Sequence, residues 1–238
     1  MTGPKAPAHG SPRPLAGPIV TLDGPAGAGK STTAREVACR LGFRHLNSGT
    51  FYRALAFALL DAEIVPERWS ELRTEHFDAL PLRVEPTSEG FRTMLDARVL
   101  EEELRSPLVT GEASRLAAFA PVRAWLLGVQ REVGRGGRLV ADGRDMGTVV
   151  FPEAELKFYL TADLSARARR RLRDHGVDAP TVAEIEEEAR RIEDRDRCDS
   201  ERRHAPLRRP DDAYEIDTTR LEFDQQVEAI VARVLGAG

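Results

Sequence analysis

Cysteine is scarce in this chain of 238 residues, and so are long apolar runs. The two cysteines, Cys39 and Cys198, are too few and too far apart in the sequence for a disulfide framework or a zinc site. We therefore expect a reducing, cytoplasmic environment. The longest apolar runs, such as residues 55–60, fall far short of the roughly 18 residues that a membrane-spanning helix needs, so no membrane association is expected.

Lysine is also scarce. Only Lys5, Lys30 and Lys157 are lysines among the 35 basic residues, so the other 32 are arginines, a bias typical of a GC-rich coding background. With 39 acidic residues the net charge is -4, which argues against a nucleic-acid-binding protein, because a phosphate backbone selects a net basic face. The hydrophobic fraction of 41% and the charged fraction of 31% are ordinary for one globular domain.

The first 17 residues differ in composition from the rest of the chain. They are rich in glycine, proline and alanine, and they lack both the apolar core of a secretory signal and any helical or strand period. We expect residues 1–17 to form a disordered extension. A wrongly assigned start codon would explain the same composition.

From residue 18 onward, apolar runs and turn residues predict alternating strands and helices. Strands are expected at residues 18–23, 81–85, 91–96, 138–142, 155–162 and 214–217. Helices are expected at residues 31–41, 51–62, 107–120, 121–133 and 222–235, with a long polar helical region at 163–202. The first helix is expected to end at Gly42, and the second to have Thr50 as its N-cap. This order favours a parallel sheet covered by helices on both faces, with residues 75–110 as an insertion.

Residues 24–31 (GPAGAGKS) match the phosphate-binding pattern G-x-x-x-x-G-K-[ST] between an apolar strand and a helix. The glycines let backbone N–H groups wrap a phosphate, and the helix N-terminus adds partial positive charge. Lys30 is expected to reach the β and γ phosphates of a bound nucleotide, and Ser31 to hold Mg²⁺. The glycine spacing excludes a dinucleotide site. The predicted phosphate-binding residues are Gly24, Pro25, Ala26, Gly27, Ala28, Gly29, Lys30, Ser31 and Thr32.

A second apolar strand, residues 138–142, ends in the carboxylate of Asp142. An acid at this point is typical of the Walker B arrangement and is expected to hold Mg²⁺ through a bound water. The following Arg144 and Asp145 lie in a loop at the carboxyl end of the same strand, where open α/β sheets bind their ligands. A salt-bridged loop without a ligand is the alternative interpretation.

Four segments together resemble the bacterial cytidylate kinases, a family of P-loop nucleoside monophosphate kinases. They are GPAGAGKST (24–32), NSGTFYR (47–53), ADGRDMGTVVFP (141–152) and RDRCDSERRHAPL (195–207). The resemblance implies a three-layer α/β/α P-loop fold over residues 18–238, with a parallel central sheet, an inserted monophosphate-binding lobe at about 48–125 and a mobile lid at about 165–182. It also implies a monomer that transfers the γ-phosphoryl group of ATP to CMP or dCMP with Mg²⁺.

The resemblance assigns roles to single residues as well. The positions that match CMP contacts are Ser48, Arg53, Ser114, Arg123, Arg144, Asp145, Arg195, Asp199 and Arg202. Among them, Arg53 and Arg144 correspond to phosphate contacts, and Ser114 to a cytosine contact. The residues expected to act in the transfer are Lys30, Arg144, Asp145, Arg169 and Arg170, the last two in the arginine-dense lid. Asn47 departs from the family pattern, since many members have Asp there.

Transfer to a phosphate oxygen needs no general base, because the second pKa of a phosphomonoester is about 6. The five histidines are scattered along the chain and are interpreted as surface or packing residues. A shikimate or deoxynucleoside kinase would transfer to a hydroxyl, which benefits from a base, and no clear base is present. A GTPase-like switch would need an N-K-x-D signature, which the sequence lacks. A DNA-associated ATPase is disfavoured by the net charge of -4.

Overall fold

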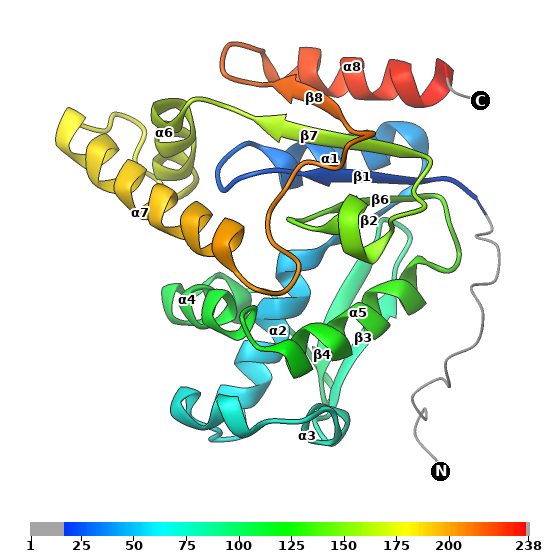
Figure 1. Ribbon diagram of the computed structural model, residues 1–238, viewed down its shortest axis with the longest axis vertical. Coiled ribbons are helices and arrows are strands. Elements are labelled where there is room, and N and C mark those ends of the chain that lie inside the picture. The colour runs from blue at the N-terminus through cyan, green and yellow to red at the C-terminus, as the bar shows by residue number, and fades with distance from the viewer. Residues whose placement is uncertain (1–16, 237–238) are drawn as a thin grey trace.

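The computed structural model describes residues 17–236 and is built around a five-stranded parallel sheet (Figure 1). The extension expected at residues 1–17 therefore lies, apart from Gly17, outside the described residues. In spatial order the strands are β2 (Arg44–Asn47), β6 (Leu139–Asp142), β1 (Ile19–Asp23), β7 (Leu156–Thr161) and β8 (Tyr214–Asp217). Because β1 lies between β6 and β7, the loops that follow β1 and β6 leave the sheet side by side.

Successive side chains of the central strands point to opposite faces of the sheet, which gives the domain three layers. Val20 packs with α1 (Lys30–Leu41) and α8 (Phe223–Gly236) in one buried cluster. Its neighbour Ile19 packs on the other face with residues of α2 (Ser48–Asp61), α4 (Pro107–Leu116) and α5 (Ala120–Gly134). The predicted three-layer α/β/α fold with a parallel sheet is confirmed.

The elements between α2 and α4 interrupt this parallel order and form a small lobe. They are two 3-10 helices, Pro66–Glu71 and Glu103–Arg105, the helix α3 (Thr74–Asp78) and the antiparallel strands β3 (Leu82–Pro86), β4 (Phe91–Leu95) and β5 (Arg98–Val99). The expected hairpin is present and gains β5 as a third strand. Its turn lies against the edge of the central sheet, because Glu89 O accepts the N–H of His45 at 2.8 Å.

The polar region expected as helical at 163–202 consists of two packed helices, α6 (Leu164–Asp174) and α7 (Val182–Glu201). The chain turns between them because Gly176 has a φ of 84° and Thr181 caps α7 by accepting the N–H of Glu184. In Figure 1 the pair projects from the sheet on the side of the loop after β1. Among the described residues, no helix combines the length and the apolar character that crossing a membrane requires.

Two local predictions were wrong, and one strand was missed. Strand β2 was not predicted, because its sequence RHLN has three polar residues and offers no alternation of apolar and polar side chains. Helix α2 begins at Ser48 with Asn47, not Thr50, as its cap, since Asn47 Oδ1 accepts the N–H of Thr50 at 2.9 Å. The helix expected at 107–120 ends at Leu116, because Phe119 takes an extended conformation at the start of the next helix.

Candidate active site

The phosphate loop is shaped by its glycines and by the backbone of β7. Gly24 has a φ of 144°, and a Cβ there would lie 2.1 Å from Leu160 O, so only glycine fits. Lys30 is buried at the start of α1, and its Nζ donates to Pro25 O at 2.6 Å. Burial, followed by the nearby charge of Arg144, lowers the pKa of Lys30 well below its usual value. The loop therefore holds a compact, poorly solvated cation among its own backbone groups.

Oxygen and nitrogen atoms from three segments meet at the carboxylate of Asp142. Ser31 Oγ donates to its Oδ2 at 2.5 Å, Asn47 Nδ2 donates to Oδ1 at 3.2 Å, and His45 Nε2 lies 2.7 Å from Oδ1. Burial alone would raise the pKa of Asp142, but its hydrogen bonds to His45 and Ser31 lower it. A hydroxyl beside an ionised carboxylate is a donor set that suits Mg²⁺, so Ser31 and Asp142 fit the metal that the sequence predicted.

His45 and Asn47 were not assigned to this cluster from the sequence. The histidine was interpreted as a surface or packing residue, because nothing in the chain order places it beside Asp142. The parallel register of β2 and β6 brings the two residues together, with His45 opposite Val140 and Asn47 opposite Asp142. Asn47 therefore does two things at once, since its Oδ1 caps α2 while its Nδ2 donates to Asp142.

A group of cations lies beside the phosphate loop. Arg195 comes from α7, and no group among residues 17–236 accepts a hydrogen bond from its buried Nε. Burial, and then the charge of Arg144, lowers the pKa of Arg195 to about 10. Arg53 on α2 is also largely buried, and this burial lowers its pKa. Lys30 and these two guanidinium groups form a cation cluster, and Arg144 adds a further positive charge beside it. Closely spaced cations are the electrostatic character of an anion site.

Two further arginines share one carboxylate. Arg144 Nε donates to Asp199 Oδ2 at 2.9 Å, and Arg202 Nη1 donates to Asp199 Oδ1 at 3.3 Å. The Nη2 of Arg202 is buried without a partner among the described residues. Asp199 therefore links the loop after β6 to the end of α7 and leaves donors of both arginines unused. Two of the predicted CMP-contact residues, Arg144 and Arg202, are thus partly engaged by an internal ion pair.

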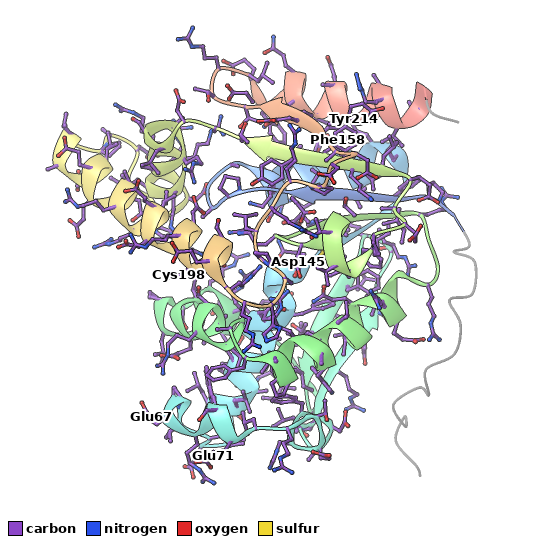
Figure 2. All side chains as sticks on the ribbon, viewed as in Figure 1. Glu67, Glu71, Asp145, Phe158, Cys198 and Tyr214 are labelled. Atoms are coloured by element: carbon purple, nitrogen blue, oxygen red, sulfur yellow. The ribbon has the colours of Figure 1, made fainter. Side chains whose placement is uncertain are left out.

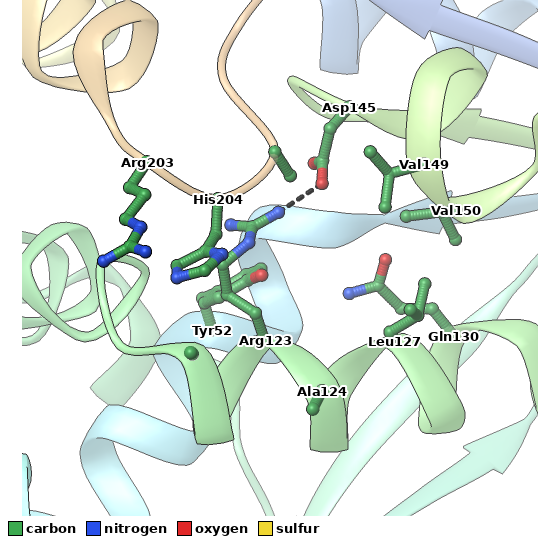
Figure 3. Close-up of a pocket in the computed structure, with 12 residues that line it drawn as sticks. Tyr52, Arg123, Ala124, Leu127, Gln130, Asp145, Val149, Val150, Arg203 and His204 are labelled. Carbon is green, nitrogen blue, oxygen red and sulfur yellow. Dashed lines mark hydrogen bonds and ion pairs between the residues drawn. The ribbon is translucent and has the colours of Figure 1, made fainter.

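A cavity of about 320 Å³ lies between α5, the loop after β6 and residues 203–205 (Figure 3). It is lined by two of the predicted acceptor residues, Arg123 and Asp145, which form a buried ion pair through Arg123 Nη2 and Asp145 Oδ2. Burial raises the pKa of Asp145 and raises that of Tyr52, at the same cavity, to about 12. In Figure 2, Asp145 lies near the centre of the molecule, between the sheet and the small lobe.

Some predicted residues do not join this arrangement. Ser114 is half-buried on α4 and does not line the cavity. Arg169 is exposed on α6. Arg170 does approach the phosphate loop, since a Cβ on Gly29 would lie 3.9 Å from its Nη1, and it donates to Thr218 Oγ1 at 2.9 Å.

Arg167 and Asp196 contact the phosphate loop directly, although the sequence did not single them out as site residues. Asp196 Oδ1 accepts the N–H of Ala26 at 2.8 Å, and Arg167 Nη1 donates to Ala26 O at 3.1 Å. The two side chains also pair with each other. Both groups of Ala26 are therefore bound by the pair of helices α6 and α7. The signal for Asp196 was its place in the segment RDRCDSER, where a carboxylate stands between arginines.

Comparisons with known proteins identify relatives over nearly the whole chain. The family model described as cytidylate kinase matches residues 20–235. The cytidylate kinase of Chlorobaculum tepidum is 40% identical over 218 residues, which cover 89% of this chain and 90% of that protein. The bifunctional pantoate ligase/cytidylate kinase of Synechocystis is 44% identical over 220 residues, covering 90% of this chain. The chain spans only 42% of the length of that bifunctional relative.

Among solved structures, a shikimate kinase from Acinetobacter baumannii in complex with shikimate is similar to this chain. The TM-score is 0.40 with 19% sequence identity, and the match covers 92% of this chain and 94% of that one. A likeness of this size does not identify an acceptor. The assignment of the fold therefore rests on the strand order and the layers of this chain.

Proposed function

The chain belongs to the cytidylate kinase family, and from this we propose that it transfers the γ-phosphoryl group of ATP to CMP or dCMP, giving ADP and CDP or dCDP. The observation that carries the proposal is the cation cluster of Lys30, Arg53 and Arg195 beside the phosphate loop. Two polyanions must approach each other for this transfer, and buried guanidinium groups offset their repulsion.

On the donor side, the backbone N–H groups of the phosphate loop and Lys30 bind the phosphates of ATP. Lys30 exchanges its contact with Pro25 O for phosphate oxygens, which are the stronger acceptors. Ser31 and Asp142 hold Mg²⁺, which supplies charge neutralisation at the phosphates. Helices α6 and α7 act as the lid, with the mobile part at about 165–182, and Arg170 is its contact with the end of the loop.

On the acceptor side, Ser48, Arg53, Arg144 and Arg195 bind the phosphate of CMP. This phosphate is ionised near neutral pH, so its oxygen attacks without a general base. Asp145 and Arg123 form the base side, where the carboxylate accepts from the N4 amino group that cytosine has and uracil lacks. Asp199 and Arg202 bind the ribose and the phosphate of CMP. We further propose a cytoplasmic monomer that binds neither membranes nor nucleic acids.

An ADP-release assay with CMP, dCMP, UMP, AMP and shikimate as acceptors tests the proposal. CMP and dCMP are expected to be the fastest acceptors. Equal turnover of CMP and shikimate would refute it.

A variant pair locates the acceptor site. Arg53→Ala is expected to raise the KM for CMP at least about tenfold and leave that for ATP nearly unchanged, because one charge-assisted hydrogen bond is lost. Arg115→Ala is the matched control, since Arg115 is an exposed arginine that pairs with Glu112, and both residues lie on α4. A similar change in both variants, or no change in either, would contradict the assignment.

A further inference from the structure

Asp23 is a fully buried carboxylate at the point where β1 becomes the phosphate loop. Its exposed fraction is 0%, and it directly precedes Gly24. Neither the phosphate-binding pattern nor the predicted acceptor residues include it. It lies beside β6, because β1 and β6 pair in parallel with Leu22 opposite Asp142.

Both oxygens of Asp23 accept backbone hydrogen bonds from the loop after β6. Oδ1 accepts the N–H of Met146 at 2.8 Å, and Oδ2 accepts the N–H of Gly147 at 2.7 Å. Met146 and Gly147 begin a π-helical turn, Met146–Val150, and the first N–H groups of such a turn have no partner within it. Asp23 satisfies two of them from a different strand.

A second anchor holds the other side of the same loop. The N–H of Gly143 donates to Leu22 O at 3.1 Å. Arg144 and Asp145 are therefore enclosed between two attachments, and both attachments are made by the two residues that precede the phosphate loop. A displacement of β1 relative to this loop would move the arginine and the carboxylate together.

Capping this turn with a buried carboxylate lowers the stability of the folded state. Burial raises the pKa of Asp23 to about 7, against the two backbone hydrogen bonds, which lower it. An ionised side chain taken out of water opposes folding unless its hydrogen bonds compensate fully. Costs of this kind are typical of residues whose position matters for activity. The carboxylate offers what no neutral side chain of its size does, two acceptors fixed on one rigid plane.

We propose that Asp23 is a positioning residue, which holds Arg144 and Asp145 at a set distance from the phosphate loop and so aligns the acceptor with the donor. The inference rests on the proposed CMP kinase activity, because it concerns the alignment of that acceptor. Asp23 does not contact the acceptor itself; it acts through the backbone of residues 146 and 147. Misplacement of a reacting group by about 1 Å is enough to slow a reaction about a hundredfold.

The test compares Asp23→Asn with Thr21→Val in steady-state kinetics with CMP and ATP varied separately. Asp23→Asn keeps the shape of the side chain but places an amide N–H₂ against one backbone N–H, so the loop must shift. Thr21→Val is the matched control, because Thr21 is fully buried on the same strand and its Oγ1 has no hydrogen-bond partner among the described residues. The melting temperature of each variant, measured by circular dichroism, reports whether it is folded.

For a folded Asp23→Asn we expect the KM for CMP to rise and kcat to fall, each about tenfold or more, while the KM for ATP changes less than about threefold. Thr21→Val should match the wild type. Unchanged CMP kinetics in Asp23→Asn, or equal losses for both substrates, would overturn the inference.

Asp23→Ser, which removes the buried charge and keeps one short acceptor, is measured in parallel and covers the case in which the Asn variant is unfolded. It should show the same selective loss for CMP, and normal CMP kinetics in this variant would also overturn the inference. The CMP kinase activity of the wild type distinguishes a failure of the proposed function from a failure of the role proposed for Asp23. A wild-type protein without CMP kinase activity refutes the proposed function, whereas an active wild type with an equally active Asp23→Asn refutes only the role of Asp23.

Discussion

Replacing Arg195 by methionine is expected to stabilise the protein while it impairs turnover. The guanidinium is buried in a cluster with other cations, and its pKa falls from 12.5 to about 10, first through burial and then through Arg144. Each pKa unit corresponds to about 1.4 kcal/mol, so at neutral pH, where the group is charged, the folded state bears roughly 3 kcal/mol of unfavourable free energy. Methionine fills similar space without charge and relieves most of this cost.

For a chain of this size about 1 kcal/mol shifts the melting temperature by about 2–4 °C, so Arg195→Met should melt several degrees above the wild type and at most about 10 °C above it. Differential scanning fluorimetry in phosphate-free buffer measures the shift. CMP with ATP should stabilise the wild type far more than the variant, because the anions neutralise Arg195 only in the wild type. kcat/KM for CMP should fall by about a hundredfold.

Arg197→Met is the control for this experiment, because Arg197 is exposed on the same helix and pairs with Asp194 there. It should change neither the melting temperature nor the turnover. A lower melting temperature for Arg195→Met, with kinetics like those of Arg197→Met, would show that Arg195 is a structural residue and that the cation cluster is not an anion site.

Three further outcomes follow from the contacts described above. Burial raises the pKa of Asp23 from 3.8 to about 7, so its contribution to stability is fully present below about pH 3.8 and is lost as the pH rises to about 7; the melting temperature of Asp23→Asn relative to the wild type should increase between about pH 5 and about pH 7 and level off above that, and a flat difference between about pH 5 and about pH 7 would contradict this. Arg167→Gln and Asp196→Asn should each lower kcat/KM for ATP about tenfold, and the double variant should lose little more, because both hold Ala26; additive losses in a double-mutant cycle would show independent roles. Gly90→Ala should lower the melting temperature by several degrees in thermal unfolding, because its Cβ would lie 2.4 Å from His45 O; an unchanged melting temperature would show that the hairpin is not attached to the sheet edge.

Features that lie within one stretch of chain could be predicted. The phosphate loop is one, because its glycines, lysine and serine are consecutive and stand between an apolar strand and a helix. The C-cap at Gly42 is another, and it adopts the left-handed conformation with a φ of 64° that favours glycine. The cap of α2 was placed three residues too late, because Asn47 and Thr50 are both good capping residues and only the backbone geometry separates them.

Contacts between distant segments could not be predicted from the chain. Asp142 was expected near Mg²⁺, but its neighbours His45 and Asn47 come from a strand whose polar sequence does not indicate a strand. Asp23 was counted as the end of an apolar strand, since nothing near it in the sequence suggests that it binds residues 123 and 124 positions away. Such pairings depend on which strands are adjacent, and apolar strands of similar length do not encode their order.

The sequence by itself determined the chemistry of this protein. A phosphate loop, a carboxylate after a second strand and an arginine-rich segment are local patterns. Each can be recognised from consecutive residues or from the residue type alone. The tertiary structure decided which of these groups meet. The order β2-β6-β1-β7-β8 places the loops after β1 and β6 side by side, and the packing of α6 and α7 brings Arg195 and Asp196 to them. Which of the 32 arginines come together near the phosphate loop depends on burial and on the packing of distant segments, and those are properties of the folded chain.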